Sequence, residues 1–340
     1  MGKRYFSVGT ESVYGTPVAT VQDMDIVSES ISPDNQMIDV ETAAYREMRV
    51  RVPGPFGLGG GVDFVGNPDV VGTLLYYTFC QQADVTSTND GTVYYHTMSP
   101  QQEIDSFTAE IAPAVPKTPG GTDYKLRRAE GGFITSLSLE ATARELVTGS
   151  ADMTFQTESI QTDDQLPTFS TLNPLVYHQG TVEIEDSTLS NVEAFSVTFE
   201  NDIDTDAFTL GSRFLPSMQI QGFGISGELD LQFNDWTSYQ KVYDGVGTAS
   251  EPVTLVGTDT YSSQKLELNL VGEASDAGVG NYANYQVKLE FPNVYFDTAE
   301  ASFDRRDRIV NNLGWTALYD AGAGYSCIAR VTNLTDISAL

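Results

Sequence analysis

Cysteine and histidine are scarce in this chain of 340 residues. Cys80 and Cys327 are the only cysteines, and two cysteines so far apart do not form a disulfide framework, so we expect two reduced, buried thiols. His96 and His178 each follow a tyrosine in separate stretches, which predicts strand positions rather than a catalytic pair. Neither residue type therefore points to an active site.

Long apolar runs and catalytic motifs are also missing. No run of 18 apolar residues occurs, so the sequence predicts no membrane span. The first residues turn polar within a few positions and do not look like a signal peptide. There is no nucleophile elbow, zinc-protease helix, CxxC pair or P-loop, and the spacing of the many carboxylates singles out no pair. We therefore expect no enzymatic activity and no cofactor.

One short segment begins like a calcium loop. Asp202, Asp204 and Asp206 alternate with other residues, as the first ligands of an EF-hand do. Ala207 and Arg213 stand where that pattern needs Gly and Glu, and a strand-like stretch precedes the segment. A solvated turn is the preferred interpretation, and the three aspartates are weak candidates for a metal site.

Basic residues are few. The chain has 18 Lys and Arg against 47 Asp and Glu, a formal net charge of −29. So acidic a protein repels a polyanion, which argues against specific binding of DNA or RNA. Concentrated salt shortens the Debye length and makes such self-repulsion tolerable. The low Lys content and the even spread of acidic residues therefore favour a halophilic source over an ordinary acidic protein.

Strand-forming residues, in contrast, are abundant. The chain holds 17 Tyr and 17 Phe, with many Thr and Val. Helical patterns are few: Asn67 and Pro68 predict the start of a helix that runs to about residue 78, and Asn234 predicts the cap of a shorter helix ending near Val242. Alternation with period two predicts strands at 136–141, 194–200, 228–233 and 285–291.

A segment near the start of the chain recurs past the middle. Residues 56–76 and 223–243 are identical at six of 21 positions, where unrelated segments would share about one, so we infer a diverged duplication. A polar, Pro-bounded stretch at 159–174 lies between the copies. Together they predict two tandem domains, 1–165 and 166–340. The first would include an N-terminal arm and a Pro-rich insertion at 112–121, which we expect to be irregular.

Several landmarks follow one another along the chain. The opening Glu11-Ser12-Val13-Tyr14-Gly15-Thr16 has the pattern E-x-x-Y-G-T, and a Gly-rich strand leads into the helix that holds Leu74 and Leu75. Core-strand patterns follow at 133–141, 195–201, 224–229 and 289–294. In order and spacing these landmarks resemble the tail tube proteins of long-tailed, siphovirus-type viruses.

The resemblance implies an all-β fold of two tandem tail-tube β-sandwich domains with short helices. Their inner sheets would join those of neighbours into a closed barrel. Long loops at 39–54 and 204–222 would touch the adjacent ring. The candidates for contacts with acidic surface on that ring are Arg46, Arg49, Arg51 and Arg213. Alternatively, these arginines cover their own domain.

The implied role is that of a non-enzymatic virion protein: the major tail tube subunit, stacked as rings into the channel for genome delivery. Two units per chain predict trimeric, pseudo-sixfold rings, with a hexamer as the alternative. The implied partners are other copies of the chain and the tail terminator, tape measure and baseplate proteins. Viral DNA would pass through without specific binding, and no membrane would be involved.

The implied location is the virion tail, assembled in the host cytoplasm, and the acidity fits a haloarchaeal virus. Two other classes stay open. One is another virion ring protein of related fold, such as a tail terminator or baseplate component. The other is a β-sandwich carbohydrate-binding module, against which the lack of a signal peptide counts.

Overall fold

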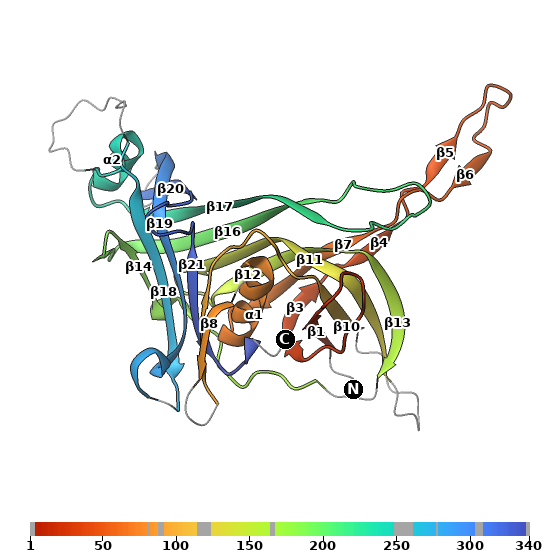
Figure 1. The fold of residues 1–340 in the computed structure, drawn as a ribbon. Coiled ribbons are helices and arrows are strands. Elements are labelled where there is room, and N and C mark those ends of the chain that lie inside the picture. The colour runs from red at the N-terminus through yellow and green to blue at the C-terminus, as the bar shows by residue number, and fades with distance from the viewer. Residues whose placement is uncertain are drawn as a thin grey trace.

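The computed structural model of the chain describes residues 4–79, 82–87, 92–113, 124–163, 167–247, 261–276, 278–302 and 309–337. These residues form antiparallel β-structure with two short α-helices (Figure 1), as expected for an all-β fold. The first part of the chain contains β1 (Arg4–Thr10), β2 (Gln22–Met24), β3 (Ile26–Glu29), β4 (Ser32–Asp34), β5 (Ile38–Val40), β6 (Val50–Val52), β7 (Gly57–Val65), α1 (Pro68–Phe79), β8 (Gln82–Ser87), β9 (Tyr94–Met98), β10 (Phe107–Pro113), β11 (Tyr124–Thr142), β12 (Thr148–Phe155) and β13 (Thr157–Asp163).

The second part contains β14 (Gly180–Ile184), β15 (Ser187–Thr188), β16 (Val192–Asp204), β17 (Gln219–Gln232), α2 (Thr237–Asp244), β18 (Gln264–Ala274), β19 (Asn284–Ser302), β20 (Val310–Ala317) and β21 (Ile328–Asn333). Two 3-10 turns, η1 (Tyr177–Gln179) and η2 (Gly280–Tyr282), complete the described elements. The four strands predicted from alternation all lie within β11, β16, β17 and β19, although the third prediction runs one residue past the end of β17.

One antiparallel sheet, called here the main sheet, runs through both parts of the chain. Its strand order is β3/β4–β7–β12–β11–β16–β17–β20–β19. The parts meet where β11 pairs with β16, with Leu137 opposite Phe199 and Ser138 opposite Thr198. In Figure 1 the main sheet lies across the top of the body, with the long β16 and β17 extending towards β7 and β4.

Two outer sheets lie below the main sheet in Figure 1. One has the order β2–β1–β10–β11–β13, and the other β15–β14–β18–β19–β21–β9–β8. The long strands β11 and β19 enter an outer sheet with their first half and the main sheet with their second. Apolar residues facing inward from these sheets form one large core, in which the Phe291 ring contacts the rings of Phe199 (6.4 Å) and Trp315 (5.0 Å).

The strand pairings of the first part recur in the second. The chain of pairings β1–β10–β11 in the first part matches β14–β18–β19 in the second. Likewise, the pairings β13–β11–β12–β7 match β21–β19–β20–β17. β-Bulges recur at matching places, one between Ile134 and Ser136 and its counterpart between Phe296 and Thr298. The inferred duplication therefore reaches well beyond residues 56–76 and 223–243. The division at residue 165 falls between β13 and β14 and stays a prediction.

Each Gly-rich strand leads into a helix, but the two helices begin differently. The side-chain oxygen of Asn67 accepts a hydrogen bond from the Asp69 N–H at 2.9 Å, which confirms the predicted cap of α1. For α2 the predicted cap, Asn234, is wrong. α2 begins at Thr237, two residues later than a cap at Asn234 predicts, and its N-cap residue, Trp236, makes no side-chain capping bond. The Asp235 carboxylate, just before the cap, accepts the Thr237 N–H at 2.9 Å.

Three other local expectations need correction. His96 lies in β9 as predicted, but His178 lies in η1, because the Gln179 side chain accepts the Val176 N–H at 2.8 Å and closes a turn. Ala112 belongs to β10, where β1 pairs with it, and residues 114–121 of the expected irregular insertion lie outside the described residues. The expected loop at 39–54 contains most of a hairpin of β5 and β6.

Candidate assembly surfaces

The main sheet is free of basic residues. Its strand segments, 26–34, 57–65, 133–142, 148–155, 192–204, 219–232, 294–302 and 310–317, contain no Lys, Arg or His. The face turned away from the core, called here the acidic face, presents Ser, Thr, Gly and Asn together with carboxylates. These carboxylates are Asp34, Asp63, Glu140, Asp152, Glu200, Glu228, Asp230 and Glu300.

Neutral groups hold three of these carboxylates. The Ser28 hydroxyl donates to Asp63 at 2.5 Å, and the Asn312 amide donates to Asp230 at 2.7 Å and to Glu228 at 3.3 Å. These bonds fix the side chains without neutralising them. The face therefore keeps its negative charge.

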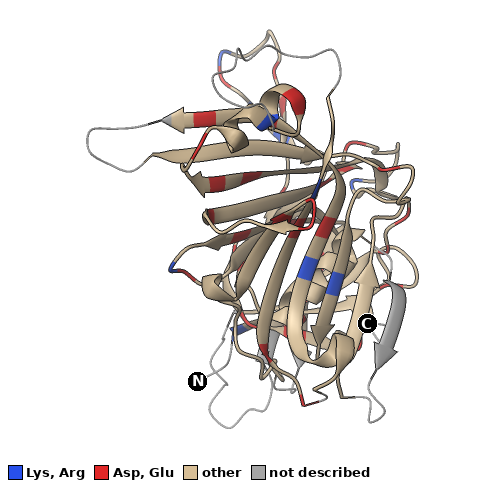
Figure 2. Ribbon diagram, turned by 90° about the vertical axis from the view of Figure 1, so that its left-hand side faces the viewer, with Lys and Arg blue, Asp and Glu red and all other residues tan. Residues whose placement is uncertain are grey.

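Cations instead gather on the outer sheets. Glu110 on β10 accepts from Arg128 at 2.5 Å, and at the matching place on β18 Glu267 lies 2.6 Å from Lys265 and 2.8 Å from Lys288. Burial raises the pKa of the Glu267 carboxyl, but the hydrogen bonds from the two ammonium groups outweigh it and lower that pKa. In Figure 2 Asp and Glu recur along many strands, whereas Lys and Arg mark a few places.

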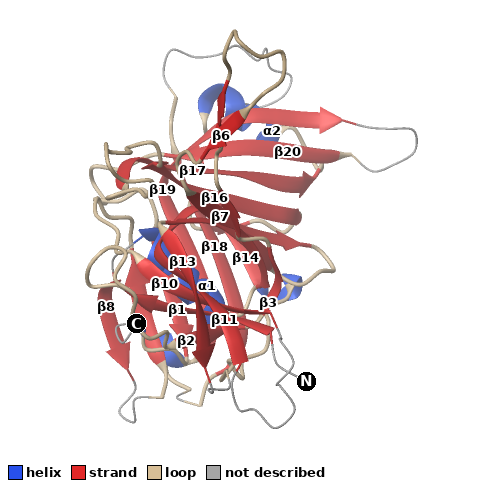
Figure 3. Ribbon diagram, turned by 90° about the vertical axis from the view of Figure 1, so that its right-hand side faces the viewer, coloured by secondary structure: helices blue, strands red, loops and turns tan. Residues whose placement is uncertain are grey.

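The main sheet ends in two edges. Within the described part of the chain, β3 and β4 pair only with β7 in this sheet, and residues 295–302 of β19 pair only with β20. The sheet of a single chain is therefore open, and the barrel implied by the resemblance would need strands from other copies. Figure 3 shows α2 beside β20 near one end of the sheet and α1 among the strands.

The β5–β6 hairpin projects from the body (Figure 1) and exposes both charged and apolar side chains. Arg51 forms an ion pair with Asp39 across the hairpin, and this hydrogen bond lowers the pKa of the Asp39 carboxyl. The Arg49 guanidinium lies 4.8 Å from the centre of the Tyr45 ring, and Arg46 is exposed. The exposed apolar residues on and beside the hairpin are Met37, Ile38, Val40, Met48, Val50 and Val52.

Arg213, the fourth arginine candidate, lies apart from the other three. It is in the loop between β16 and β17, and its guanidinium donates to the Gly54 carbonyl at 2.7 Å and to the Asn35 side chain at 2.9 Å. The neighbouring Phe214 ring packs edge-on against Phe56, with ring centres 5.5 Å apart. Arg213 thus ties this loop to the base of the hairpin within one chain.

The segment with the three aspartates forms a turn. Asp202 and Asp204 end β16, and Asp204 accepts the N–H of Asp206 at 2.9 Å. No group of three or more metal-ligating side chains occurs among the described residues. Cys327 is a buried free thiol whose pKa burial raises, while Cys80 lies outside the described residues.

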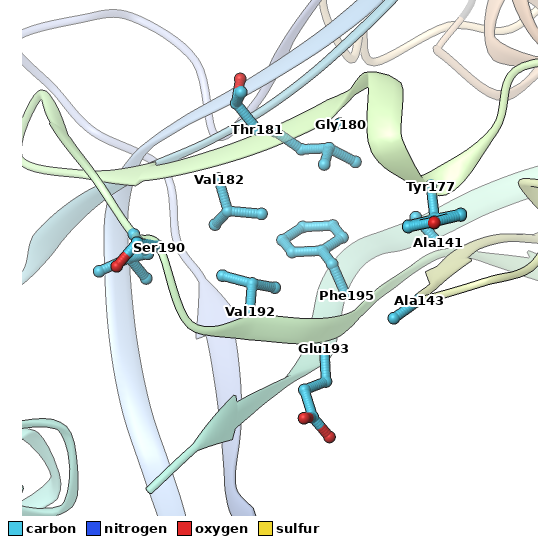
Figure 4. A pocket seen from close by; sticks show the side chains of 12 residues that line it. Ala141, Ala143, Tyr177, Gly180, Thr181, Val182, Ser190, Val192, Glu193 and Phe195 are labelled. Carbon is cyan, nitrogen blue, oxygen red and sulfur yellow. The ribbon is translucent and has the colours of Figure 1, made fainter. Parts of the chain in front are cut away.

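A small cavity of about 190 Å³ lies where the end of β11 and the start of β16 meet β14. Figure 4 shows Val182, Val192 and Phe195 facing into it and the Glu193 carboxylate turned away from them. The lining side chains form no nucleophile–base pair.

Sequence reasoning noted the E-x-x-Y-G-T opening but missed the role of its Glu11. This carboxylate is 4% exposed and accepts hydrogen bonds from the Gly15 and Gly131 N–H groups and from the hydroxyls of Ser106 and Thr108, at 2.7–2.9 Å. Glu11 therefore connects the N-terminal segment to β10 and β11. The free sheet edges were also missed, because they depend on pairings between distant segments.

Together these features define a β-rich protein with an open, acidic main sheet. The family model described as phage tail tube protein matches residues 3–317, and the chain belongs to that family. No curated protein matches the chain. No helix in the described residues is long and apolar enough to cross a bilayer.

Proposed function

We propose that the chain is the major tail tube subunit and that its copies form rings that stack into a channel for genome delivery. The observation that carries this proposal is the acidic face of the main sheet, whose strand segments contain no basic residue. A channel wall of this kind repels DNA phosphates, so that the duplex slides along it without binding. The partners would be other copies of the chain and the tail terminator, tape measure and baseplate proteins.

The repeated strand pairings support a ring of three chains with pseudo-sixfold symmetry. Each chain supplies two four-stranded segments to the main sheet, already joined by β11 and β16. Three chains would then match a ring of six single units, and closure would remove the open edges. A ring of six chains is the alternative.

The projecting hairpin is our candidate for contact between rings. Its tip is exposed and carries Arg46, Arg49 and apolar side chains, while Arg213 holds its base. Arg51 already has a carboxylate partner in Asp39, so Arg46 and Arg49 are the better placed to meet acidic surface on the next ring.

Negative-stain microscopy of the purified chain in molar KCl tests the proposal. We expect rings with a sixfold outline that average with threefold symmetry, together with stacked tubes. Compact single particles under all conditions would overturn the tube assignment. Rings that never stack would favour a tail terminator or baseplate component, and rings of six chains would overturn the trimer.

A charge-reversal experiment tests the channel wall. Glu140→Lys with Glu200→Lys places cations on the acidic face, and we expect the resulting tubes to retain duplex DNA at moderate salt in a filter-binding assay. The control is Glu183→Lys with Glu273→Lys on the outer sheet around β14 and β18. Equal DNA retention by both variants would show that the acidic face does not line the channel.

The net charge of −29 also supports a halophilic source, as in a haloarchaeal virus. We expect the melting temperature of the chain to rise from dilute buffer to molar KCl, measured by circular dichroism. A higher melting temperature in dilute buffer would overturn this interpretation.

A further inference from the structure

We propose that neighbouring copies join by repeating the β11–β16 pairing of the chain itself, residue for residue. Residues 298–302 of β19 in one copy would pair, antiparallel, with residues 30–34 at the β3–β4 edge of the next. Thr298 would lie opposite Asp34, and Glu300 opposite Ser32. This inference rests on the proposed ring assembly and adds the register of its joint.

The first step is the match between β11 and β19. Val65 and Gln232 are corresponding positions of the two repeat copies. Reading across the sheet, Val65 lies opposite Thr148, which lies opposite Glu140. In the second half, Gln232 lies opposite Val310, which lies opposite Ser302. Ser302 therefore corresponds to Glu140, and Glu300 to Ser138.

The matching bulges confirm this correspondence independently. The bulge of β11 follows Ile134, and the bulge of β19 follows Phe296, six residues before Glu140 and Ser302 respectively. A misaligned comparison would not bring both bulges to the same place.

The second step is the match between β16 and the β3–β4 edge. Gly57 and Gly224 are corresponding positions, and their partners are Asp34 and Glu200. A bulge again agrees, between Ile26 and Ser28 in one half and between Val192 and Ala194 in the other. Asp34 therefore corresponds to Glu200, and Ser32 to Thr198.

Within the chain, Ser136 lies opposite Glu200 and Ser138 opposite Thr198. Replacing each residue by its counterpart gives Thr298 opposite Asp34 and Glu300 opposite Ser32, with no like charges face to face. A slip of two residues can place Glu300 opposite Asp34, which is destabilising. A slip of one residue would turn the acidic face of one strand towards the core of its neighbour.

The helices support the same joint. Beside the β11–β16 pairing, α1 of the first half docks on the second half, where Asp69 accepts the N–H groups of Leu334 and Thr335 at 2.9 and 3.0 Å. α2 is placed likewise beside β19, but Trp236 is 45% exposed. In the second half α1 contacts β21, and the strand that corresponds to β21 in the first half is β13. No helix in the described part of the same chain covers β13 in this way, and its Ile160 side chain is 77% exposed. The repeated joint would bring the α2 aromatics to the face that holds Ile160.

Disulfide cross-linking of assembled rings tests the register. The test variant is Glu300→Cys with Ser32→Cys, both exposed in the single chain. A matched positive control is Ser138→Cys with Thr198→Cys, the same positions of the internal joint, which should link within one chain. The register control is Glu300→Cys with Ser28→Cys, four residues away along the same edge. Variants with only one of the introduced cysteines control for disulfides to the native Cys80 or Cys327.

On non-reducing gels we expect the test variant to give linked trimers, at least about five-fold more than the register control, because directly opposite residues meet disulfide geometry. The same samples are imaged before oxidation. Rings without a link at 300/32, but with a link at 300/28, would overturn the register and leave the tube proposal standing. An absence of rings in the unsubstituted chain would overturn the tube proposal itself.

Discussion

α1 and α2 follow corresponding strands of the repeat, yet their surroundings differ. Eleven of the twelve residues of α1 are buried, whereas in α2 only Gln240 is. The residues have diverged accordingly, from Val70 and Leu74 in α1 to Thr237 and Lys241 at the same positions of α2. The difference shows that the helix of the first half is already covered by the second half of the same chain. The helix of the second half still presents aromatic side chains to solvent.

The largest effect should come from truncating corresponding residues of the two helices. Leu75 is fully buried, so Leu75→Ala should lower the free energy of unfolding of the single chain by about 2–5 kcal/mol. The matching change, Val242→Ala in α2, should cost less than about 1 kcal/mol, because Val242 is only partly buried. Urea denaturation of unassembled protein measures both. Equal losses would show that α2 is as well packed as α1.

A second comparison concerns Glu11, whose buried carboxylate links segments of the first half by hydrogen bonds. Glu11→Gln replaces one acceptor oxygen by a donor in front of buried N–H and hydroxyl groups, and should cost about 1–3 kcal/mol. Ser187, the matching position in the second half, begins β15 and is exposed, so Ser187→Ala should change stability by less than about 0.5 kcal/mol. Thermal unfolding separates the two. An unchanged melting temperature for Glu11→Gln would mean that these hydrogen bonds do not stabilise the fold.

The histidines provide a test by pH. Burial lowers the pKa of His96, although hydrogen bonds to Thr335 and Asn333 oppose it. The unfolded chain then binds the proton more tightly than the folded chain. The stability associated with neutral His96 is therefore present above about pH 6.5, the ordinary value, and is lost as pH falls towards the lowered folded value.

We expect His96→Gln to reduce the loss of unfolding free energy between pH 7.5 and 5.5. His178→Gln, at an exposed position, should leave that loss unchanged. Chemical denaturation at a series of pH values provides the measurement. If the unfolding free energy of wild type and of His96→Gln depends on pH in the same way, His96 does not contribute to the pH dependence of stability.

The smallest effect on the single chain should come from the hairpin arginines. Solvent screens exposed ion pairs strongly, so replacing Arg46, Arg49 and Arg51 by Ala should barely change monomer stability. If these residues bridge rings, the variant should still form rings but shorter tubes in micrographs. Arg213→Ala, which loosens the hairpin base, is the comparison.

Two outcomes of that experiment would change the interpretation. Tubes of normal length would mean that the hairpin acts through shape or apolar contact. Loss of the rings themselves would place the arginines within the protomer.

Local patterns predicted much of the fold. Alternation located the strands at 136–141 and 285–291, and Asn67 capped α1 as expected. The β5–β6 hairpin was missed because its two alternating strands, Ile38–Val40 and Val50–Val52, are only three residues long each, too short for a pattern to stand out. The start of α2 was misplaced because its N-cap residue is Trp236, whose side chain offers no capping acceptor and so no signal in the sequence.

The surfaces were less predictable than the elements. The arginine content of the two long loops was visible, but not that Arg213 bonds to Gly54, 159 residues away. Glu11 stood in a recognised pattern, yet its partners Ser106, Thr108 and Gly131 are brought together only by the fold. Edges and registers arise from such long-range pairing, and a pattern within one segment does not contain them.

The internal β11–β16 joint has a consequence for the concentration at which rings can persist. In a ring of identical joints, half of them would close as each chain folds, where the partner strand is tethered and its effective concentration is high. Only the other half would depend on encounters between molecules. The residues of the internal joint also differ from those of the free edge. Phe199 in β16 corresponds to Pro33 in β4. Because proline offers no N–H, the exposed edge is a weakened template for any single strand. The intended neighbour would offset this loss with the further contacts of the whole joint, which an unrelated strand does not make.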